Sequence, residues 1–341
     1  MLFANQDKRT VNLGLQGGGA HGAFTWGVLD YLLEDGRLRF EGVSGTSAGA
    51  MNAVILAHGL LQGGRDGARA ALQTFWHAVA ATLPFEMATQ GGAGQAITLV
   101  PGLKALLQFT QHFSPEQLNP FDINPLRDIL SKQVDFARLR TQSPVKLFIA
   151  AAHARSGKVR IFRQPEIEVD TILASACLPM LHHTIEIEGE PYWDGGYAAN
   201  PAVFPLFQEC AAHDILLVLL APREHKDVPR STEDIKDRMR ELAFNVTFLR
   251  EMRVFASLQQ QAESAWFHRG RLERRIAKAK FHIIEPHDDM GLLKPETKLA
   301  ASQCFFDMLR DLGRAQAQAW VACHYARVGK RSTVDLAELF Q

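Results

Sequence analysis

One serine in the chain lies in a pattern that suits nucleophilic catalysis. Residues 45–49 read Gly-Thr-Ser-Ala-Gly and fit G-x-S-x-G, between a strand-like run at 40–44 and an apolar helical run at 48–61. In that context small residues permit a strained turn that lifts the serine hydroxyl clear of the backbone. The N-terminus of the following helix also favours negative charge. We therefore expect Ser47 to be a nucleophile rather than part of a chance match, with the turn supported by Gly45 and Gly49.

A glycine-rich loop follows the first strand-like run of the chain. Residues 17–22 read Gly-Gly-Gly-Ala-His-Gly and match G-x-G-x-x-G. A dinucleotide-binding turn would need an acidic residue at the end of the second strand, whereas the nearby acid, Glu41, opens that strand. A glycine-rich turn without a ligand is the plainest alternative. We favour an oxyanion hole, because adjacent parallel strands would bring these backbone N–H groups beside Ser47. The residues concerned are Gly17, Gly18 and Gly19, with Gly22 in support.

A serine nucleophile requires a general base, and the chain contains 13 histidines that could serve in a Ser-His-Asp triad. In α/β-hydrolases, however, the glycine-rich loop lies well upstream of the elbow and a late histidine completes the triad. Here the loop and the elbow belong to the first two predicted strands. Asp194 is the better candidate, because the following Gly195 and Gly196 permit a backbone path that brings a carboxylate to the serine. Alone, Asp-Gly-Gly is also a common turn.

Taken together and in this order, the three patterns resemble the patatin-like phospholipase family. Residues 174–179, Ala-Ser-Ala-Cys-Leu-Pro, lie between them and resemble the family's S-x-x-x-P block. The resemblance implies a three-layer α/β/α fold with a mostly parallel central sheet. It also implies lipid acyl hydrolysis by a Ser-Asp dyad without a cofactor, with Ser47 as nucleophile, Asp194 as base and residues 17–19 as oxyanion hole.

One position departs from the family pattern. Many members carry Arg or Lys where this chain has His21. A histidine with its usual pKa near 6.5 would be mostly neutral at pH 7, unlike a permanent cation. We expect His21 to begin a helix and do not count it as catalytic.

The order of predicted elements favours an α/β fold. Two β-loop-α units open the chain, which indicates a parallel sheet covered by helices. Unbroken apolar runs at 145–152 and 214–220 are typical of buried central strands. We expect a catalytic domain over residues 10–220 with an insertion at about 62–124. Residues 221–341 are expected to form a mainly helical part packed on the same domain.

Two segments outside the motifs could contact a lipid surface. The first is the apolar stretch from Ile97 to Phe113, which we expect instead to be buried core. The second is Arg269 to Lys280, with six basic residues and one acid, which we expect to be a solvated helix face.

Composition excludes several other classes of protein. The chain has 37 Lys and Arg against 37 Asp and Glu, so bulk electrostatic binding of nucleic acid is not expected. Four cysteines without a CxxC pair indicate neither a disulfide framework nor a zinc site. Without HExxH spacing we expect no metal, and we expect solvated loop positions for the remaining candidate ligands, His182, His183, His282, His287, Asp288 and Asp289.

The sequence shows neither a signal-peptide apolar region nor an apolar run of about 18 residues. The expected protein is therefore cytoplasmic, peripheral at most to a lipid surface, and acts on a lipid or other acyl ester. A short-chain esterase, a thioesterase and an intracellular polyester hydrolase using the same dyad remain alternatives. A module that binds lipid or a partner without catalysis is a rival from another class.

Overall fold

The computed structural model describes residues 8–82, 89–90, 97–110, 112–221, 228–264, 270–286, 290 and 293–341. A mixed sheet of eight strands forms its centre. The strands are β1 (Arg9–Leu15), β2 (Leu38–Thr46), β5 (Lys146–His153), β6 (Val159–Arg163), β7 (Ile185–Ile187), β8 (Glu190–Asp194), β9 (Asp214–Val218) and β10 (Lys280–Ile284).

The strand order is β10-β9-β1-β2-β5-β8-β7, with β6 paired to β5 off this path. The five strands from β10 to β5 are parallel, whereas β6, β8 and β7 add antiparallel pairs. Every residue of β9 is buried, as expected for a strand covered on both faces. The sheet is therefore mostly parallel, as the sequence predicts.

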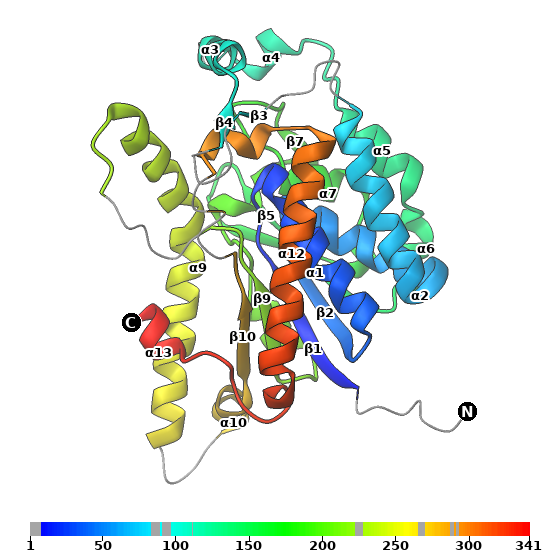
Figure 1. Cartoon of the computed structure of the whole chain (residues 1–341), viewed down its shortest axis with the longest axis vertical. Coiled ribbons are helices and arrows are strands. Elements are labelled where there is room, and N and C mark those ends of the chain that lie inside the picture. The colour runs from blue at the N-terminus through cyan, green and yellow to red at the C-terminus, as the bar shows by residue number, and fades with distance from the viewer. Residues whose placement is uncertain are drawn as a thin grey trace.

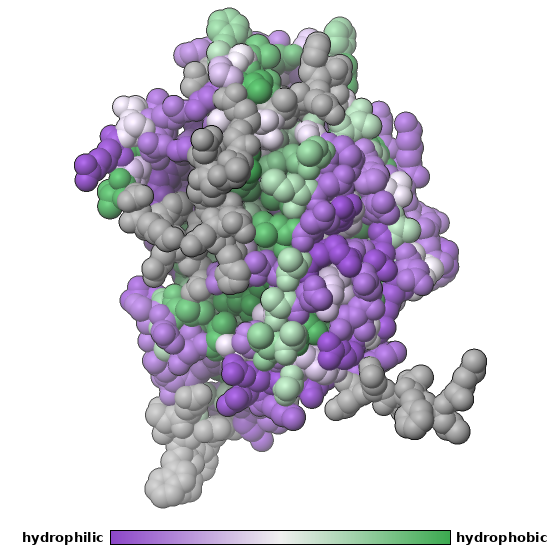
Figure 2. Space-filling model, viewed as in Figure 1, coloured by the Kyte–Doolittle hydropathy of each residue, from purple (hydrophilic) through white to green (hydrophobic). Residues whose placement is uncertain are grey.

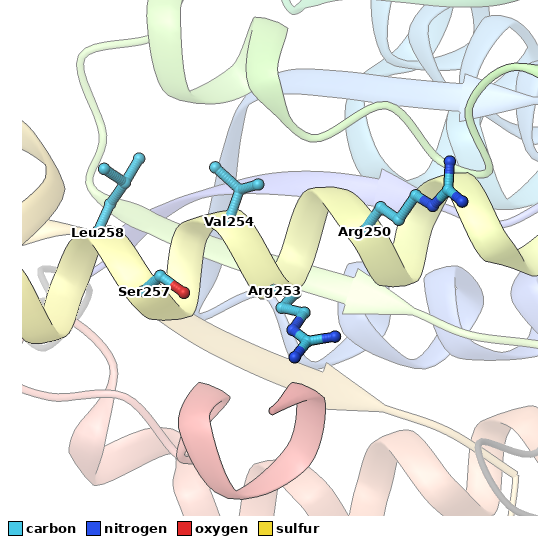
Figure 3. A pocket seen from close by; sticks show the side chains of 5 residues that line it. All are labelled: Arg250, Arg253, Val254, Ser257 and Leu258. Atoms are coloured by element: carbon cyan, nitrogen blue, oxygen red, sulfur yellow. The ribbon is translucent and has the colours of Figure 1, made fainter.

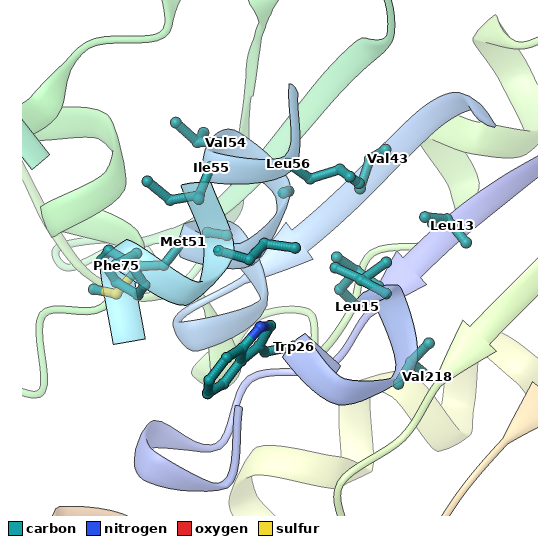
Figure 4. Close-up of a cluster of buried hydrophobic side chains, with 14 of the residues drawn as sticks. Leu13, Leu15, Trp26, Val43, Met51, Val54, Ile55, Leu56, Phe75 and Val218 are labelled. Atoms are coloured by element: carbon teal, nitrogen blue, oxygen red, sulfur yellow. The ribbon is translucent and has the colours of Figure 1, made fainter. Parts of the chain in front are cut away.

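Helices cover both faces of this sheet (Figure 1). Successive side chains of a strand point to opposite faces, so β9 sends Leu216 and Val218 into one hydrophobic cluster and Ile215 and Leu217 into a second. Figure 4 shows part of the first cluster, between the sheet and the helices. The helices over the first face are α1 (Gly22–Asp35), α2 (Ala48–Ala80), α5 (Pro125–Gln133), α6 (Phe136–Gln142), α7 (Val169–Ser175) and α12 (Gln303–His324). Those over the second face are α8 (Phe204–Glu209), α9 (Thr232–Ser264), α10 (Arg271–Lys278) and α13 (Leu336–Phe340). The three-layer α/β/α prediction is confirmed.

The C-terminal third of the chain is built into the same layers. Strand β10 extends the sheet beyond β9, and α12 packs along α1. Arg314 of α12 forms ion pairs with Asp30 and Glu34 of α1. Arg9 at the start of β1 donates to the carbonyl oxygens of Tyr325 and Val328. Segments from the two ends of the chain therefore support one core.

The segment predicted as an insertion has two different parts. Helix α2 continues through a break at Gly63 and Gly64, and its second half buries Leu72 and Phe75 in the core. Farther along lie the hairpin of β3 (Thr89–Gln90) and β4 (Thr98–Leu99), then α3 (Pro101–Thr110) and α4 (Pro115–Leu118), at one end of the molecule (Figure 1).

The expectation that residues 97–113 form buried core is wrong for their C-terminal half. Leu106 and Phe109 are 56% and 62% exposed, and Phe113 is 37% exposed. The reason is the position of α3: Leu103 packs toward the core, so the opposite side of this short helix faces outward. An apolar composition does not bury a short helix that packs on the rest of the protein with only one side.

Two further expectations are resolved by the part of the chain that the structure describes. His282 is fully buried in β10 and lies 3.0 Å from Asp214 Oδ1, so its predicted place in a solvated loop is wrong. The basic stretch forms α10, where Ile276 is buried and Arg275 donates to the carbonyl oxygens of Phe207 and Cys210. Arg269 and residues 287–289 lie outside the described residues. Within the described ranges no helix is long and apolar enough to cross a bilayer.

Candidate active site

The sharp turn between β2 and α2 holds Ser47 in a strained conformation. Its φ of 55° and ψ of −122° lie in a region that residues with a Cβ rarely adopt. The flanking glycines are required by close backbone contacts. A Cβ on Gly45 would lie 2.4 Å from Gly49 O, and one on Gly49 would lie 2.2 Å from Leu15 O. The G-x-S-x-G pattern thus encodes a sharp elbow that packs against the end of β1.

The buried side chain of Ser175 binds the backbone of this elbow. The backbone N–H of Ser47 donates to Ser175 Oγ at 2.9 Å, and the Ser175 hydroxyl donates to Ala150 O at 2.6 Å. Ser175 ends α7 and is fully buried, while Ala150 belongs to β5, the neighbour of β2. The sequence block that contains Ser175 is part of the family pattern, but its role as a bridge between elbow and sheet emerges only from the structure.

Sheet register brings Asp194 to the same place. Thr46, which precedes the nucleophile, pairs with Ala150 in β5, and Asp194 at the end of β8 pairs with Ala151. The carboxylate therefore lies across one strand from the elbow. Asp194 is 1% exposed, its Oδ1 accepts from Gly196 N–H at 2.7 Å, and its own N–H donates to Cys177 O at 2.7 Å.

The electrostatic setting of Asp194 suits a base near neutral pH. Burial raises the pKa of its carboxyl to about 7, against the opposing influence of the Gly196 N–H and the Ser47 hydroxyl. The second oxygen, Oδ2, is buried and makes no hydrogen bond within the described residues. The serine hydroxyl is thus close enough to interact with the carboxyl, although no well-aligned hydrogen bond joins them. Such looseness is common before substrate binds.

The glycine-rich loop lies directly against Ser47. A Cβ on Gly17 would lie 2.7 Å from Ser47 Cβ and 2.6 Å from Thr46 O, so no larger residue fits there. The N–H of Gly17, however, donates to Asn200 Oδ1 at 2.7 Å. Within the described residues the N–H groups of Gly18 and Gly19 have no such partner. Of the three glycines predicted to form an oxyanion hole, these two retain free donors, while Gly17 provides close approach.

Two buried amides that the sequence analysis missed hold this loop. Asn200 lies six residues after Asp194, and its Nδ2 also reaches Gly17 O at 3.4 Å. Gln16 Oε1 accepts from the backbone N–H groups of Leu220 and Ala221 after β9, at 2.6 and 3.1 Å. Both amides act across about two hundred residues of sequence, so no local pattern could have identified their roles.

His21 is part of the packing and carries no charge. It is buried, and its Nε2 lies 2.8 Å from Thr297 Oγ1 in the 3-10 turn η4 (Pro295–Leu299). Because the Thr297 hydroxyl donates to Lys294 O, it accepts from His21, which places the proton on Nε2. Burial and the charge of Lys298 lower the pKa of His21 to about 3. This neutral imidazole cannot substitute for the Arg or Lys common at its position.

The remaining reactive groups offer no competing chemistry. Burial raises the pKa of the Cys177 thiol to about 11, so it is not a nucleophile at neutral pH. Within the described residues no histidine forms a hydrogen bond to Ser47 or Asp194, and no group of three His, Cys, Asp or Glu side chains could hold a metal ion.

Two depressions lie on or beside α9. One of about 480 Å³ runs along the outer part of the helix, where its lining residues are Arg250, Arg253, Val254, Ser257 and Leu258 (Figure 3). It is remote from the elbow in the fold. The second, of about 30 Å³, reaches Gln16 and lies between the loop support and α9. Helix α9 also contacts the site directly, since Phe244 packs on Tyr197 with ring centroids 4.6 Å apart.

Comparison with known proteins points to one family. A sequence model of the patatin-like phospholipase family matches residues 13–207. Among solved structures, VipD from Legionella pneumophila shares 15% identity at a TM-score of 0.41, covering 94% of this chain and 67% of VipD. The ExoU–SpcU complex from the type III secretion system of Pseudomonas aeruginosa shares 15% at 0.36, covering 95% of this chain and 53% of that one. None of the curated protein sequences matches the chain.

Proposed function

Because the chain belongs to the patatin-like phospholipase family, we propose that it is a serine lipid acyl hydrolase that cleaves carboxylic esters through Ser47 and Asp194. Membership supports a lipid ester hydrolase as the class of enzyme; the dyad and its substrate are our proposal. The observation that carries it is a strained serine facing a buried carboxyl whose pKa of about 7 suits proton transfer.

In the first half of the reaction, ionised Asp194 accepts the hydroxyl proton of Ser47 while Oγ attacks the ester carbonyl carbon. The negative charge that develops on the carbonyl oxygen is stabilised by the free N–H groups of Gly18 and Gly19. Collapse of this intermediate breaks the bond to the leaving alcohol, which takes the proton from Asp194. An acyl group remains on Ser47.

In the second half, water replaces the alcohol. Asp194, ionised again, accepts a proton from water as its oxygen attacks the acyl carbon. The same N–H groups stabilise the second oxyanion. The carboxylic acid leaves as the proton returns to Ser47 Oγ, and the dyad is restored without a cofactor.

A fluorophosphonate label tests this proposal, with Ser47→Ala and Ser44→Ala compared. Ser44 is a suitable control because it is buried in β2, which leads into the elbow, and its hydroxyl has no partner among the described residues. We expect Ser47→Ala to lose the label and about 10³-fold or more in kcat for an activated ester. Ser44→Ala should keep both. Labelling at another residue, or more than about 1% of wild-type activity in folded Ser47→Ala, would contradict the assignment.

The acyl-chain length and the head group of the preferred substrate are tested with a panel of short esters, thioesters, polyesters and phospholipids. Released acids, measured by mass spectrometry, identify the preferred class. A wild-type protein that hydrolyses none of them and takes no label would support the rival interpretation as a binding module.

A further inference from the structure

One end of the molecule exposes an unusual set of large apolar side chains. It is formed by α3, α4, the loop that follows them and the loop after Cys177. We call it the apolar end and define it by Leu106, Phe109, Phe113, Phe121, Ile123 and Met180, which are 37–84% exposed. Figure 2 shows green, hydrophobic residues gathered where Figure 1 places α3 and α4. Contiguous exposed apolar surface commonly marks an interaction site.

The loop of the apolar end is held in shape while its side chains point outward. Asn119 Nδ2 donates to Ile123 O at 2.9 Å, and Ile123 N–H donates to Asn119 Oδ1 at 2.9 Å. This reciprocal pair closes the loop that presents Phe121 and Ile123, which are 84% and 68% exposed. Phe121 and Ile123 are therefore exposed on a loop that hydrogen bonds hold in shape.

Helix α3 is held by η4, the turn that packs against the glycine-rich loop. Lys104 pairs with Glu296 and Glu233, and Thr98 Oγ1 donates to Glu296 at 2.6 Å. Glu296 belongs to η4, whose next residue, Thr297, contacts His21. A chain of contacts through Lys104, Glu296 and Thr297 thus links α3 to the glycine-rich loop.

The other side of the apolar end continues the segment that binds the backbone of Asp194. Met180 lies three residues after Cys177, whose carbonyl oxygen accepts from Asp194 N–H. The charge of Asp122 acts on both Cys177 and His182, so the loop that carries Phe121 faces this segment. The apolar end is therefore connected to the glycine-rich loop through Lys104, and to the segment that holds Asp194 through the loop after Cys177.

We propose that the apolar end docks on the surface of zwitterionic phospholipid and so delivers the site to an ester that resides in that surface. The inference rests on the proposed function, since docking on lipid serves catalysis only if the substrate is a lipid ester. Residues 101–123 carry one Lys against one Glu and one Asp, so attraction to anionic lipid is not the driving force. Insertion of apolar side chains below the head groups is the interaction that fits.

The experiment measures binding of catalytically inactive Ser47→Ala protein to phosphatidylcholine vesicles by sedimentation, which separates docking from hydrolysis. Phe121→Ser/Ile123→Ser is compared with Val246→Ser/Val254→Ser, a control that alters two exposed valines of α9. We expect the partition coefficient of the loop variant to fall at least about tenfold, because two large side chains lose their burial in lipid. Binding of the control should stay within about twofold of the parent. Salt at about 0.5 M, which screens charges on the surface, should change binding little.

Melting temperature and hydrolysis of a water-soluble ester, measured with Ser47 restored, check that the loop variant is folded. Equal vesicle binding by the loop variant and the control would overturn docking, even if soluble esters are cleaved. So would a Ser47→Ala parent that does not bind vesicles. Self-association of the parent that the loop variant abolishes, without a change in vesicle binding, would assign the surface to a second copy. Vesicle binding without hydrolysis of any ester would instead sink the proposed function and leave docking intact.

Discussion

The elbow at Ser47 and the apolar end are shaped by different kinds of contact. At the elbow, backbone meets backbone so closely that a Cβ on Gly49 or Gly17 would lie within 2.7 Å of a neighbouring atom. At the apolar end, a Cβ on Gly102 would meet nothing within 4 Å, and Phe121 is 84% exposed. One region is built for fixed atomic positions and the other offers adaptable surface. We infer that chemistry and access to substrate are specified separately in this chain.

The largest expected effect lies at the rigid region. Asp194→Asn should lower kcat for a water-soluble ester by about 10³-fold or more, because the amide keeps the shape but cannot accept the serine proton. It should also bind vesicles as the parent does, since the apolar end is untouched. Near-normal turnover in the folded variant would reduce Asp194 to a turn residue before Gly195.

The same variant should be more stable than wild type at pH 8. The pKa of Asp194 is raised in the folded state, so the wild type is most stable below the unfolded pKa of 3.8 and loses stability as pH rises through about 7. Asparagine does not ionise, so the variant avoids this loss in free energy of unfolding, which amounts to as much as about 4 kcal/mol. Chemical denaturation at pH 4 and pH 8 measures the gain, and an equal effect at both values would contradict it.

A pair of glycine substitutions compares the two regions directly. Gly17→Ala should lower kcat by about 10²-fold or more, because the new Cβ displaces the loop whose N–H groups stabilise the oxyanion. Gly102→Ala in α3 should leave kcat unchanged, and alanine in an open helical position favours the helix by about 0.5–1 kcal/mol. Kinetics with a soluble ester and thermal melts suffice. Equal loss in both variants would show that the apolar end is as constrained as the elbow.

The smallest expected effect is that of His21 on the pH dependence of catalysis. For a soluble ester, kcat/KM should fall about tenfold per pH unit below about 7, because protonated Asp194 cannot act as base. A His21→Asn variant should show the same acidic limb, since the pKa of His21 lies far lower, at about 3. An acidic limb that moves with His21 would indicate a histidine base.

The sequence was sufficient for those parts of the site that are encoded locally. The elbow is recognisable from residues 45–49, and the order of strands places the glycine-rich loop beside it. The exposure of Phe109 was not predictable, because an apolar helix looks the same whether one side or both are covered. Asn200 and Gln16 were missed for another reason: their partners lie 183 and 204 residues away. His282 was misplaced because its partner, Asp214, belongs to a neighbouring strand.

The contact between His21 and Thr297 joins residues that lie 276 positions apart, so it forms late during synthesis of the chain. A ribosome releases a chain from its N-terminus, so residues 10–220, with all four sequence blocks, emerge long before η4. The nascent chain then carries Ser47, Asp194 and the glycine-rich loop but lacks the segment that packs against this loop. We expect hydrolysis to begin only after residue 299 has emerged, so activity would follow the glycine-rich loop, Ser47 and Asp194 with a delay.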